Sequence, residues 1–175
     1  MTPPLHPAPG PQAAELLSAL DDEMARTRPL LERLPADRLD WRPHPRSRTA
    51  GALALHLASI PGWAGTLLGK DGYDMADDPA HGAEASATKE EVLARFDANV
   101  ARARAAIAAC AESRWLEPWA LRRDGQVRRT LTRGGALRTF LLDHAIHHRA
   151  QLGVYLRLLD VPLPALYGSS ADETA

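Results

Sequence analysis

The chain has 175 residues, a single cysteine and a formal net charge of −1 at neutral pH. This length suits one domain with a substantial core, and a lone cysteine excludes an intramolecular disulfide framework. The sequence shows neither a secretory signal nor a membrane span of about 18 uninterrupted apolar residues. We therefore expect a soluble cytoplasmic protein with no membrane partner.

Residues 1–12 are rich in proline and are predicted to form a flexible N-terminal tail. Residues 13–168 contain every segment with regular hydrophobic spacing, and we expect them to form a single helical-bundle domain. Residues 169–175 are predicted to be a short C-terminal tail.

Four segments carry apolar side chains every three or four residues, as amphipathic helices do. They run from Leu16 to Leu34, from Leu53 to Leu67, from Val92 to Cys110 and from Leu137 to Leu159. Thr88-Lys89-Glu90-Glu91 is a capping-box pattern before the third segment, and Pro61 should bend or interrupt the second. Four such helices in a domain of this size predict an all-α, up-down four-helix bundle.

A small β-hairpin is predicted between the third and fourth long helices. Residues 119–123 and 126–131 alternate apolar and charged side chains around Asp124-Gly125, which is typical of a tight hairpin turn. The flanking arginines could form a basic stripe; they are Arg122, Arg123, Arg128 and Arg129. Because the net charge is near zero and no recognised binding motif accompanies them, we predict no nucleic-acid partner.

Three of the seven histidines fall within the predicted fourth helix, at positions 144, 147 and 148. His144 and His148 are four residues apart, so on a helix they share one face with Cβ atoms about 5–6 Å apart. Two imidazoles on one face can converge on a metal ion, but a third ligand must come from elsewhere in the fold.

His56 is the candidate for that third ligand because it lies in phase with Leu53 and Ile60 on the second predicted helix. An imidazole buried without a partner costs about 1–3 kcal/mol, and binding a metal removes this cost. A hydrogen-bonded interior histidine is the alternative for His56 taken alone. We thus predict a metal site formed by His56, His144 and His148.

The remaining histidines are assigned other roles. His147 falls off the apolar face, so we expect it beside the ligands or on the surface, where it is only a weak candidate for a catalytic group. His6, His44 and His81 are predicted to be ordinary solvated residues in loops or the tail.

The segment Leu137–Leu152 and its continuation Val154–Gly168 resemble the C-terminal signature of the DinB superfamily of metal-dependent four-helix-bundle proteins. Upstream, Leu39–Ser47, followed by Leu55-His56-Leu57 and Trp63, is similar to the start of the family's second helix. The resemblance covers most of the chain beyond the first dozen residues and implies a DinB-like bundle.

In the DinB superfamily a histidine of the second helix and two residues four apart on the last long helix hold a divalent metal. Carried over to this chain, these positions are His56, His144 and His148. The chain departs from the pattern at Ala150, where the family often has glycine, and at Pro61, which places the continuity of the second helix in doubt.

Three neutral imidazoles leave a coordination position open, which is typical of catalytic sites, whereas structural zinc sites are closed and rich in cysteine. Zinc and nickel both accept imidazole ligands. The resemblance implies a homodimer and a thiol S-transferase, or a related hydrolase or isomerase, in which a low-molecular-weight thiol attacks an electrophile. A noncatalytic stress-associated protein, whose ion is structural or sensed, is the alternative.

Several neighbours of the predicted ligands are assigned supporting roles. We expect Asp143 to face solvent, while Arg149 and Gln151 could contact an acidic thiol or a partner surface. Trp63 and Tyr155 should pack in the core near the site. Cys110 is predicted to fill core space.

Overall fold

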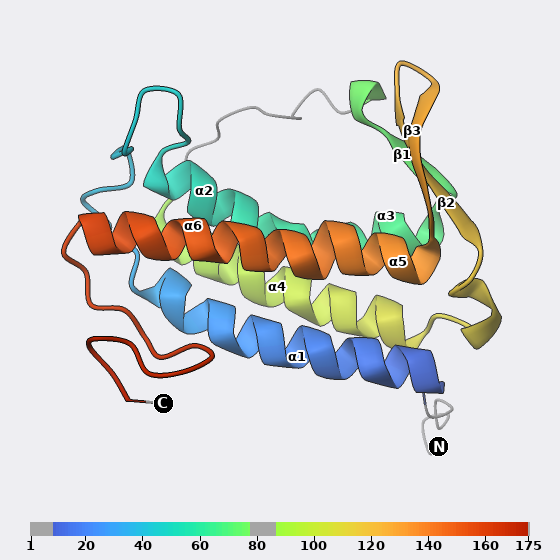
Figure 1. Cartoon of the computed structure of the whole chain (residues 1–175), viewed down its shortest axis with the longest axis horizontal. Helices are drawn as coiled ribbons and strands as arrows, with labels where there is room; N and C mark the ends of the chain where they lie inside the picture. Colours follow the sequence, from blue (N-terminus) through green and yellow to red (C-terminus); the bar gives the residue numbers. More distant parts are fainter. Residues whose placement is uncertain (1–8, 78–86, 175) are drawn as a thin grey trace, which may run out of the picture.

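The computed structural model describes residues 9–77 and 87–174 (Figure 1). These residues form a mostly helical fold with a small three-stranded sheet at one end of the helices. His6, His81 and most of the predicted N-terminal tail lie outside the described residues.

Helix α1 spans Pro11–Glu32 and buries Leu20 and Leu31 completely. The helix begins inside the segment 1–12 that we predicted to be a tail, so this predicted boundary was wrong. Proline is tolerated in the first helical turn because the backbone N–H there has no partner within the helix. A proline-rich composition therefore did not exclude a helix start at Pro11.

The second predicted helix is interrupted by Pro61, as expected. Helix α2 spans Ala50–Ser59, a 3-10 turn covers Ile60–Trp63, and α3 spans Ala64–Gly69. Thr49 caps α2, because its hydroxyl accepts a hydrogen bond from the Ala52 N–H at 3.1 Å. The run Ala50–Gly69 is long and apolar enough to cross a membrane, but 67% of its most apolar window is buried within the protein, as in a core helix of a soluble protein.

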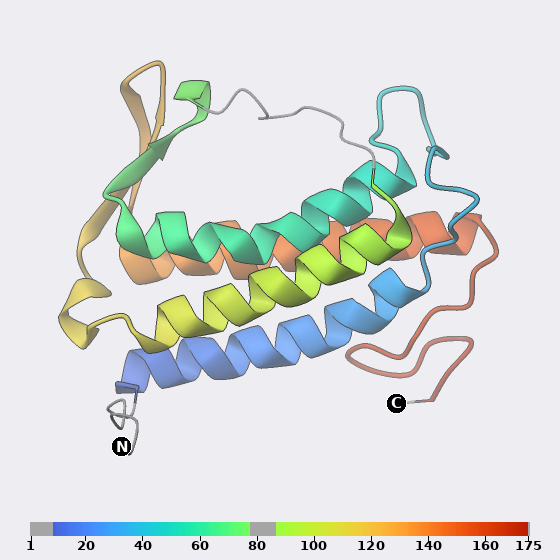
Figure 2. The same cartoon turned by 180° about the vertical axis from the view of Figure 1, so that it is seen from behind.

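Helix α4 spans Lys89–Ala108, and the predicted capping box is confirmed: Thr88 Oγ1 accepts from the Glu91 N–H at 3.2 Å, while Glu91 accepts from the Thr88 N–H at 2.8 Å. Figure 2 shows α4 between α1 and the α2–α3 run. Arg28 pairs with Asp97 at 2.9 Å, and Arg104 pairs with Asp21, so α1 and α4 are antiparallel.

The direction of α4 corrects the predicted up-down topology. Ala52 and Glu91 line one cavity, and Gly62 lies against Asn99, so α2 and α4 run in the same direction. Helix α4 therefore starts at the end of the bundle where α2 begins, whereas α3 ends beside the sheet at the other end (Figure 1).

The fourth predicted helix is one continuous run with three parts. Helix α5 spans Arg133–Leu137, a π-helical segment covers Arg138–Asp143, and α6 spans His144–Leu158. A π-helical turn holds an extra residue, so it shifts the register of the side chains that follow, and such turns are frequent at functional sites. Here the segment ends directly before His144.

The sheet contains β1 (Gly72–Asp74), β2 (Pro118–Arg123) and β3 (Gln126–Thr132), in that order. Strands β2 and β3 are antiparallel around Asp124 and Gly125, whose φ angles of 52° and 74° suit a tight hairpin turn. The expected two-stranded appendage is instead three-stranded, because β1 pairs in parallel with β2. The Asp74 carboxylate accepts hydrogen bonds from both turn residues, and backbone hydrogen bonds lower its pKa.

Arg133 joins the sheet end of the bundle to the start of the last helical run. Its guanidinium is 1% exposed, donates to the Leu67 carbonyl at 3.2 Å, and pairs with Asp71 and Glu117, each at 3.0 Å. These contacts connect the end of α3 to the start of α5. They help to set where α6 lies relative to α2.

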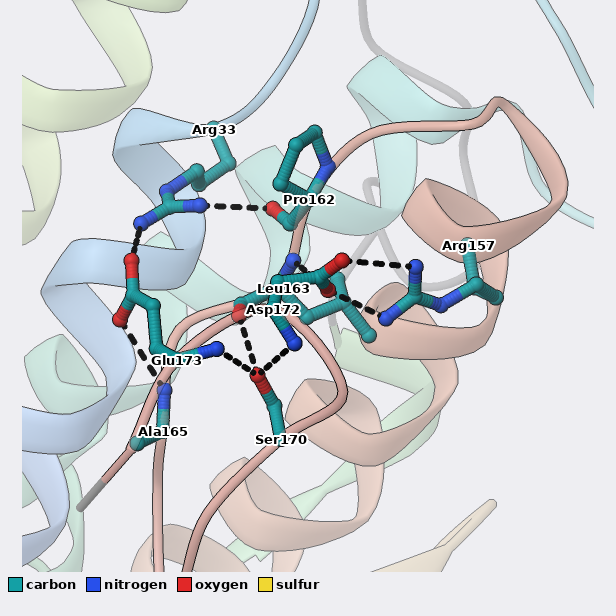
Figure 3. Close-up of polar contacts among 8 residues, drawn as sticks. All are labelled: Arg33, Arg157, Pro162, Leu163, Ala165, Ser170, Asp172 and Glu173. Atoms are coloured by element: carbon teal, nitrogen blue, oxygen red, sulfur yellow. Dashed lines mark hydrogen bonds and ion pairs between the residues drawn. The ribbon is translucent and has the colours of Figure 1, made fainter.

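The segment 169–174, predicted to be a C-terminal tail, is hydrogen-bonded to the bundle (Figure 3). Asp172 pairs with Arg157 at 2.5 Å and accepts a hydrogen bond from the Leu163 N–H at 2.8 Å. Glu173 pairs with Arg33 at the end of α1. Two adjacent carboxylates thus attach the chain end to both α1 and α6.

Candidate metal centre

The structure brings His56 of α2 together with His144 and His148 of α6. The Nε2 atoms of His56 and His144 are 3.3 Å apart, and those of His144 and His148 are 2.7 Å apart. One ligand atom from each ring lies within 4.8 Å of the other two. All three residues are half-buried, at the contact between two helices that are far apart in the sequence.

The three rings fit a divalent transition metal. With metal–nitrogen bonds of about 2.0–2.1 Å, tetrahedral geometry places two ligand nitrogens about 3.3 Å apart. The His56–His144 separation matches this value, and the closer His144–His148 pair would have to widen by roughly 0.6 Å. Within the described part of the chain, no carboxylate or thiolate joins the cluster, so the donor set is three imidazole nitrogens.

Gln151 positions His148 for this role. Its Oε1 lies 2.8 Å from Nδ1 of His148, so the amide oxygen accepts the Nδ1–H and the ring lone pair is left on Nε2, toward His144. We had assigned Gln151 to a thiol or a partner surface. The three-residue spacing from His148 on a helix was the signal that could have identified this contact.

Burial keeps the two α6 rings uncharged at neutral pH. It lowers the pKa of His144 to about 4, with smaller contributions from the positive charges of His148, His147 and Arg48. Burial also lowers the pKa of His148, an effect that the hydrogen bond to Gln151 partly opposes. A neutral imidazole is the form that binds a metal, so these rings need not lose a proton first.

Trp63 forms one wall of the cluster. Its ring centroid lies 5.8 Å from that of His56 and 5.2 Å from that of His144, both nearly edge-on. Tyr155, expected to pack near the site, lies edge-on against Trp41 at 5.6 Å. His147 is exposed, and its ring is 4.8 Å from that of His148 but outside the three-histidine cluster.

Arg149 does not take the role we expected for it. Its side chain is 2% exposed and faces α1, where it pairs with Glu23 at 2.7 Å and donates to Thr27 Oγ1 at 3.2 Å. The Tyr167 hydroxyl completes the network by donating to Glu23 at 2.6 Å. One residue beyond His148, a helix has turned about 100°, so Arg149 points away from the cluster and cannot reach a thiol there.

The other sequence-predicted residues lie near where we placed them. Asp143 is exposed and has its carboxylate 4.0 Å from Arg138. Cys110 is partly buried against the core beyond the end of α4, and burial raises the pKa of its thiol. His44 is exposed in the loop before α2, where its Nδ1 accepts from the Arg46 N–H at 3.1 Å.

Comparisons with known proteins agree with this fold. The model of the DinB family matches residues 9–175. A DinB-like protein from Bacillus subtilis is similar in structure, with a TM-score of 0.65 and 17% sequence identity, covering 86% of this chain and 95% of that chain. A putative member of the DinB family from Exiguobacterium sibiricum has a TM-score of 0.63 and 22% sequence identity. The match covers 86% of this chain and 93% of that chain. No curated protein matches the sequence. Because the family model covers nearly all of the described chain, this protein belongs to the DinB family.

Proposed function

We propose that this protein is a metal-dependent enzyme in which His56, His144 and His148 hold a divalent ion. The observation that carries the proposal is the convergence of three half-buried imidazoles with no fourth protein ligand among the described residues. A site of this kind keeps a coordination position for a ligand from solution. Zinc and nickel both suit an all-imidazole donor set, and we propose one of them as the ion.

We propose a small thiol as that ligand and a thiol S-transferase as the enzyme class. A related hydrolase or isomerase is the alternative within this proposal. When bound, the ion favours the thiolate over the thiol. Gln151 orients His148, and Trp63 shields one side of the cluster from water. The thiolate sulfur would then displace a leaving group from the electrophile, so that the new bond to sulfur forms as the bond to the leaving group breaks and its electron pair departs with that group. His147 is the candidate to carry the thiol proton to solvent.

We also propose that the protein is a cytoplasmic homodimer without a nucleic-acid or membrane partner. The burial of most of the apolar run Ala50–Gly69 supports the absence of a membrane partner. The net charge of −1 supports the absence of a nucleic-acid partner.

A noncatalytic role is the second candidate, and one observation favours it. His56 comes from α2 and the other two histidines from α6, so an ion between them would cross-link two helices of the bundle. Such an ion would contribute its binding free energy to folding. In that case the protein would be stabilised by the ion or would sense it under stress.

Elemental analysis of the natively purified protein and of alanine variants tests the site. The variants His56→Ala, His144→Ala and His148→Ala should each lose the ion, whereas His147→Ala is the control and should keep it. Retention of metal by the His148 variant together with its loss from the His147 variant would move the site onto His147.

The thiol proposal is tested with the cobalt-substituted protein. Adding a small thiol should produce a sulfur-to-cobalt charge-transfer band that is absent with the corresponding alcohol. If no thiol changes the spectrum, and removing the ion unfolds the protein, the noncatalytic role is the correct one.

A further inference from the structure

Helices α1 and α4 lie side by side and form one outer face of the bundle, which we call the α1–α4 face (Figure 2). A groove of about 420 Å³ runs between the two helices on this face. Its floor is apolar, since Met24 and Phe96 are buried there and Val100 is half-buried. Two of its lining residues are exposed alanines, Ala25 on α1 and Ala101 on α4. Such small side chains allow a helix of another molecule to approach closely.

Two ion pairs cross this groove. Arg28 of α1 pairs with Asp97 of α4 at 2.9 Å. Asp21 of α1 pairs with Arg104 of α4. On each helix the aspartate comes seven residues before the arginine, so the two charges lie on one side of the helix, about 10.5 Å apart along its axis. Because α1 and α4 are antiparallel, the four charges alternate in sign around the groove. All four side chains are between 43% and 49% exposed, so a partner can reach them.

The α1–α4 face has an approximate two-fold symmetry. Residues 21–28 read Asp-Asp-Glu-Met-Ala-Arg-Thr-Arg, and residues 97–104 read Asp-Ala-Asn-Val-Ala-Arg-Ala-Arg. Both segments begin with aspartate, end with arginine, and have an apolar residue and an alanine in the middle. Ala25 and Ala101 therefore lie midway between the two ion pairs. Rotation by half a turn about this centre exchanges α1 with α4 and leaves the pattern of charges unchanged.

We infer that the α1–α4 face is the surface on which two copies of this chain pack together. In a two-fold dimer the same patch lies on both sides of the contact, so it has to be complementary to itself. If the two-fold axis runs across the helices in the plane of the face, Asp21 lies opposite the partner's Arg28. If the axis runs along the helices, Asp21 lies opposite the partner's Arg104. With either axis, every aspartate lies opposite an arginine, and the alanines meet at the centre.

Charge complementarity favours a second copy over a partner of another kind. A uniformly acidic or uniformly basic surface would meet like charges at two of the four charged positions, and such contacts are unfavourable. In the dimer each charge would have one partner in its own chain and one across the contact. Isolated exposed ion pairs contribute little, whereas a network of several charges contributes more. The inference rests on the homodimer of the proposed function, whose interface it assigns.

A large charged side chain at the centre of the face tests the assignment. Ala101→Arg should convert the dimer into a monomer of 19.0 kDa, as measured by sedimentation equilibrium. Ala150→Arg is the matched control, because Ala150 is an exposed alanine on α6 and the change in charge is the same, so this variant should stay dimeric. Unchanged thermal unfolding and metal content of both variants show that the fold and the histidine cluster are intact.

The results separate this inference from the rest of the proposed function. If the wild type is a dimer and Ala101→Arg dimerises as strongly, the α1–α4 face is not the interface and the homodimer stands. A monomeric wild type would overturn both the interface and the homodimer. Neither result affects the three-histidine site, which the metal content of the histidine variants tests independently.

Reversing all four charges tests the alternating pattern itself. The reversed variant carries Asp21→Arg, Arg28→Asp, Asp97→Arg and Arg104→Asp. It keeps both ion pairs within the chain, and two reversed copies remain complementary to each other. A mixed dimer with the wild type would instead place like charges opposite one another at all four positions.

We therefore expect the reversed variant to form dimers without exchanging subunits with the wild type. Energy transfer between copies labelled at their N-termini with donor and acceptor dyes measures the exchange. Differently labelled wild-type copies, which should exchange freely, are the control. A monomeric reversed variant, or one that exchanges with the wild type as readily as the wild type does with itself, would overturn the inference.

Discussion

Gln151 accepts a hydrogen bond from Nδ1 of His148 one turn earlier on α6, at 2.8 Å. This contact selects the tautomer with its lone pair on Nε2, the nitrogen that lies 2.7 Å from Nε2 of His144. An exposed glutamine therefore controls the direction in which a half-buried ring presents its metal-binding atom.

Replacing Gln151 by alanine should weaken metal binding by about tenfold, because the ring of His148 would lose its orientation and its preferred tautomer. Competition with a chromogenic chelator measures the change. Gln126→Ala, an exposed glutamine on β3, is the control and should bind metal like the wild type. An unaltered affinity in the Gln151 variant would show that packing alone holds the ring.

Arg149→Met should lower the free energy of unfolding by about 3–5 kcal/mol, because it leaves the Glu23 carboxylate without its main partner. Urea denaturation measures the loss. Arg157→Met removes an exposed ion pair on the same helix and should cost far less. Adding Glu23→Leu to the Arg149 variant should recover part of the stability, and a double variant no more stable than the single one would contradict this account.

Asn99→Leu should cost about 1–3 kcal/mol in unfolding free energy, since the Ala58 carbonyl would lose a buried hydrogen bond. Asn99 donates to this carbonyl at 2.8 Å, at the point where the turn containing Pro61 ends α2. Ser59→Ala is the control, because it removes a side-chain hydrogen bond to Leu55 in the same helix without leaving a buried donor or acceptor unpaired. Similar losses in the two variants would mean that the Asn99 contact contributes nothing specific.

Attachment of the C-terminal segment should weaken in acid. The hydrogen bond from Arg157 lowers the pKa of Asp172, and the one from Arg33 lowers the pKa of Glu173. Both carboxylates thus bind protons more weakly when attached than when free. Their contribution to the stability of the attached segment is complete above their ordinary pKa values of about 4. It is lost as the pH falls through the lowered pKa values of the attached state.

Amide-exchange protection of Leu163 and Ala165, whose N–H groups donate to Asp172 and Glu173, reports this attachment. Protection should be present at about pH 6 and reduced at about pH 3.5. The double variant Asp172→Asn, Glu173→Gln should lose protection already at the higher pH. Equal protection in the wild type at both values would show that these ion pairs do not hold the segment.

Features that depend on local sequence were predictable. The Thr88 capping box, the interruption at Pro61 and the turn at Asp124-Gly125 each follow from the backbone preferences of a few adjacent residues, and the structure contains all three. Helical phase also indicated that His56, His144 and His148 would face the same interior, because each lies on the apolar face of its own helix.

Features that depend on distant parts of the chain were not predictable in this way. Strand β1 has only three residues and forms because β2 offers it an edge. The parallel course of α2 and α4 depends on the end of the bundle at which α4 starts, and the sequence before Thr88 has no regular hydrophobic spacing that would predict it.

The sequence by itself therefore determined which side chains could meet, because periodicity places a residue on a face of its own helix. Only the tertiary structure decided what each face meets. It directed Arg149 to Glu23 on α1, and it directed Arg133 to Asp71 beyond the end of α3. The physical reason is that burial and charge compensation are properties of packed surfaces, and those surfaces come from segments that are far apart in the chain.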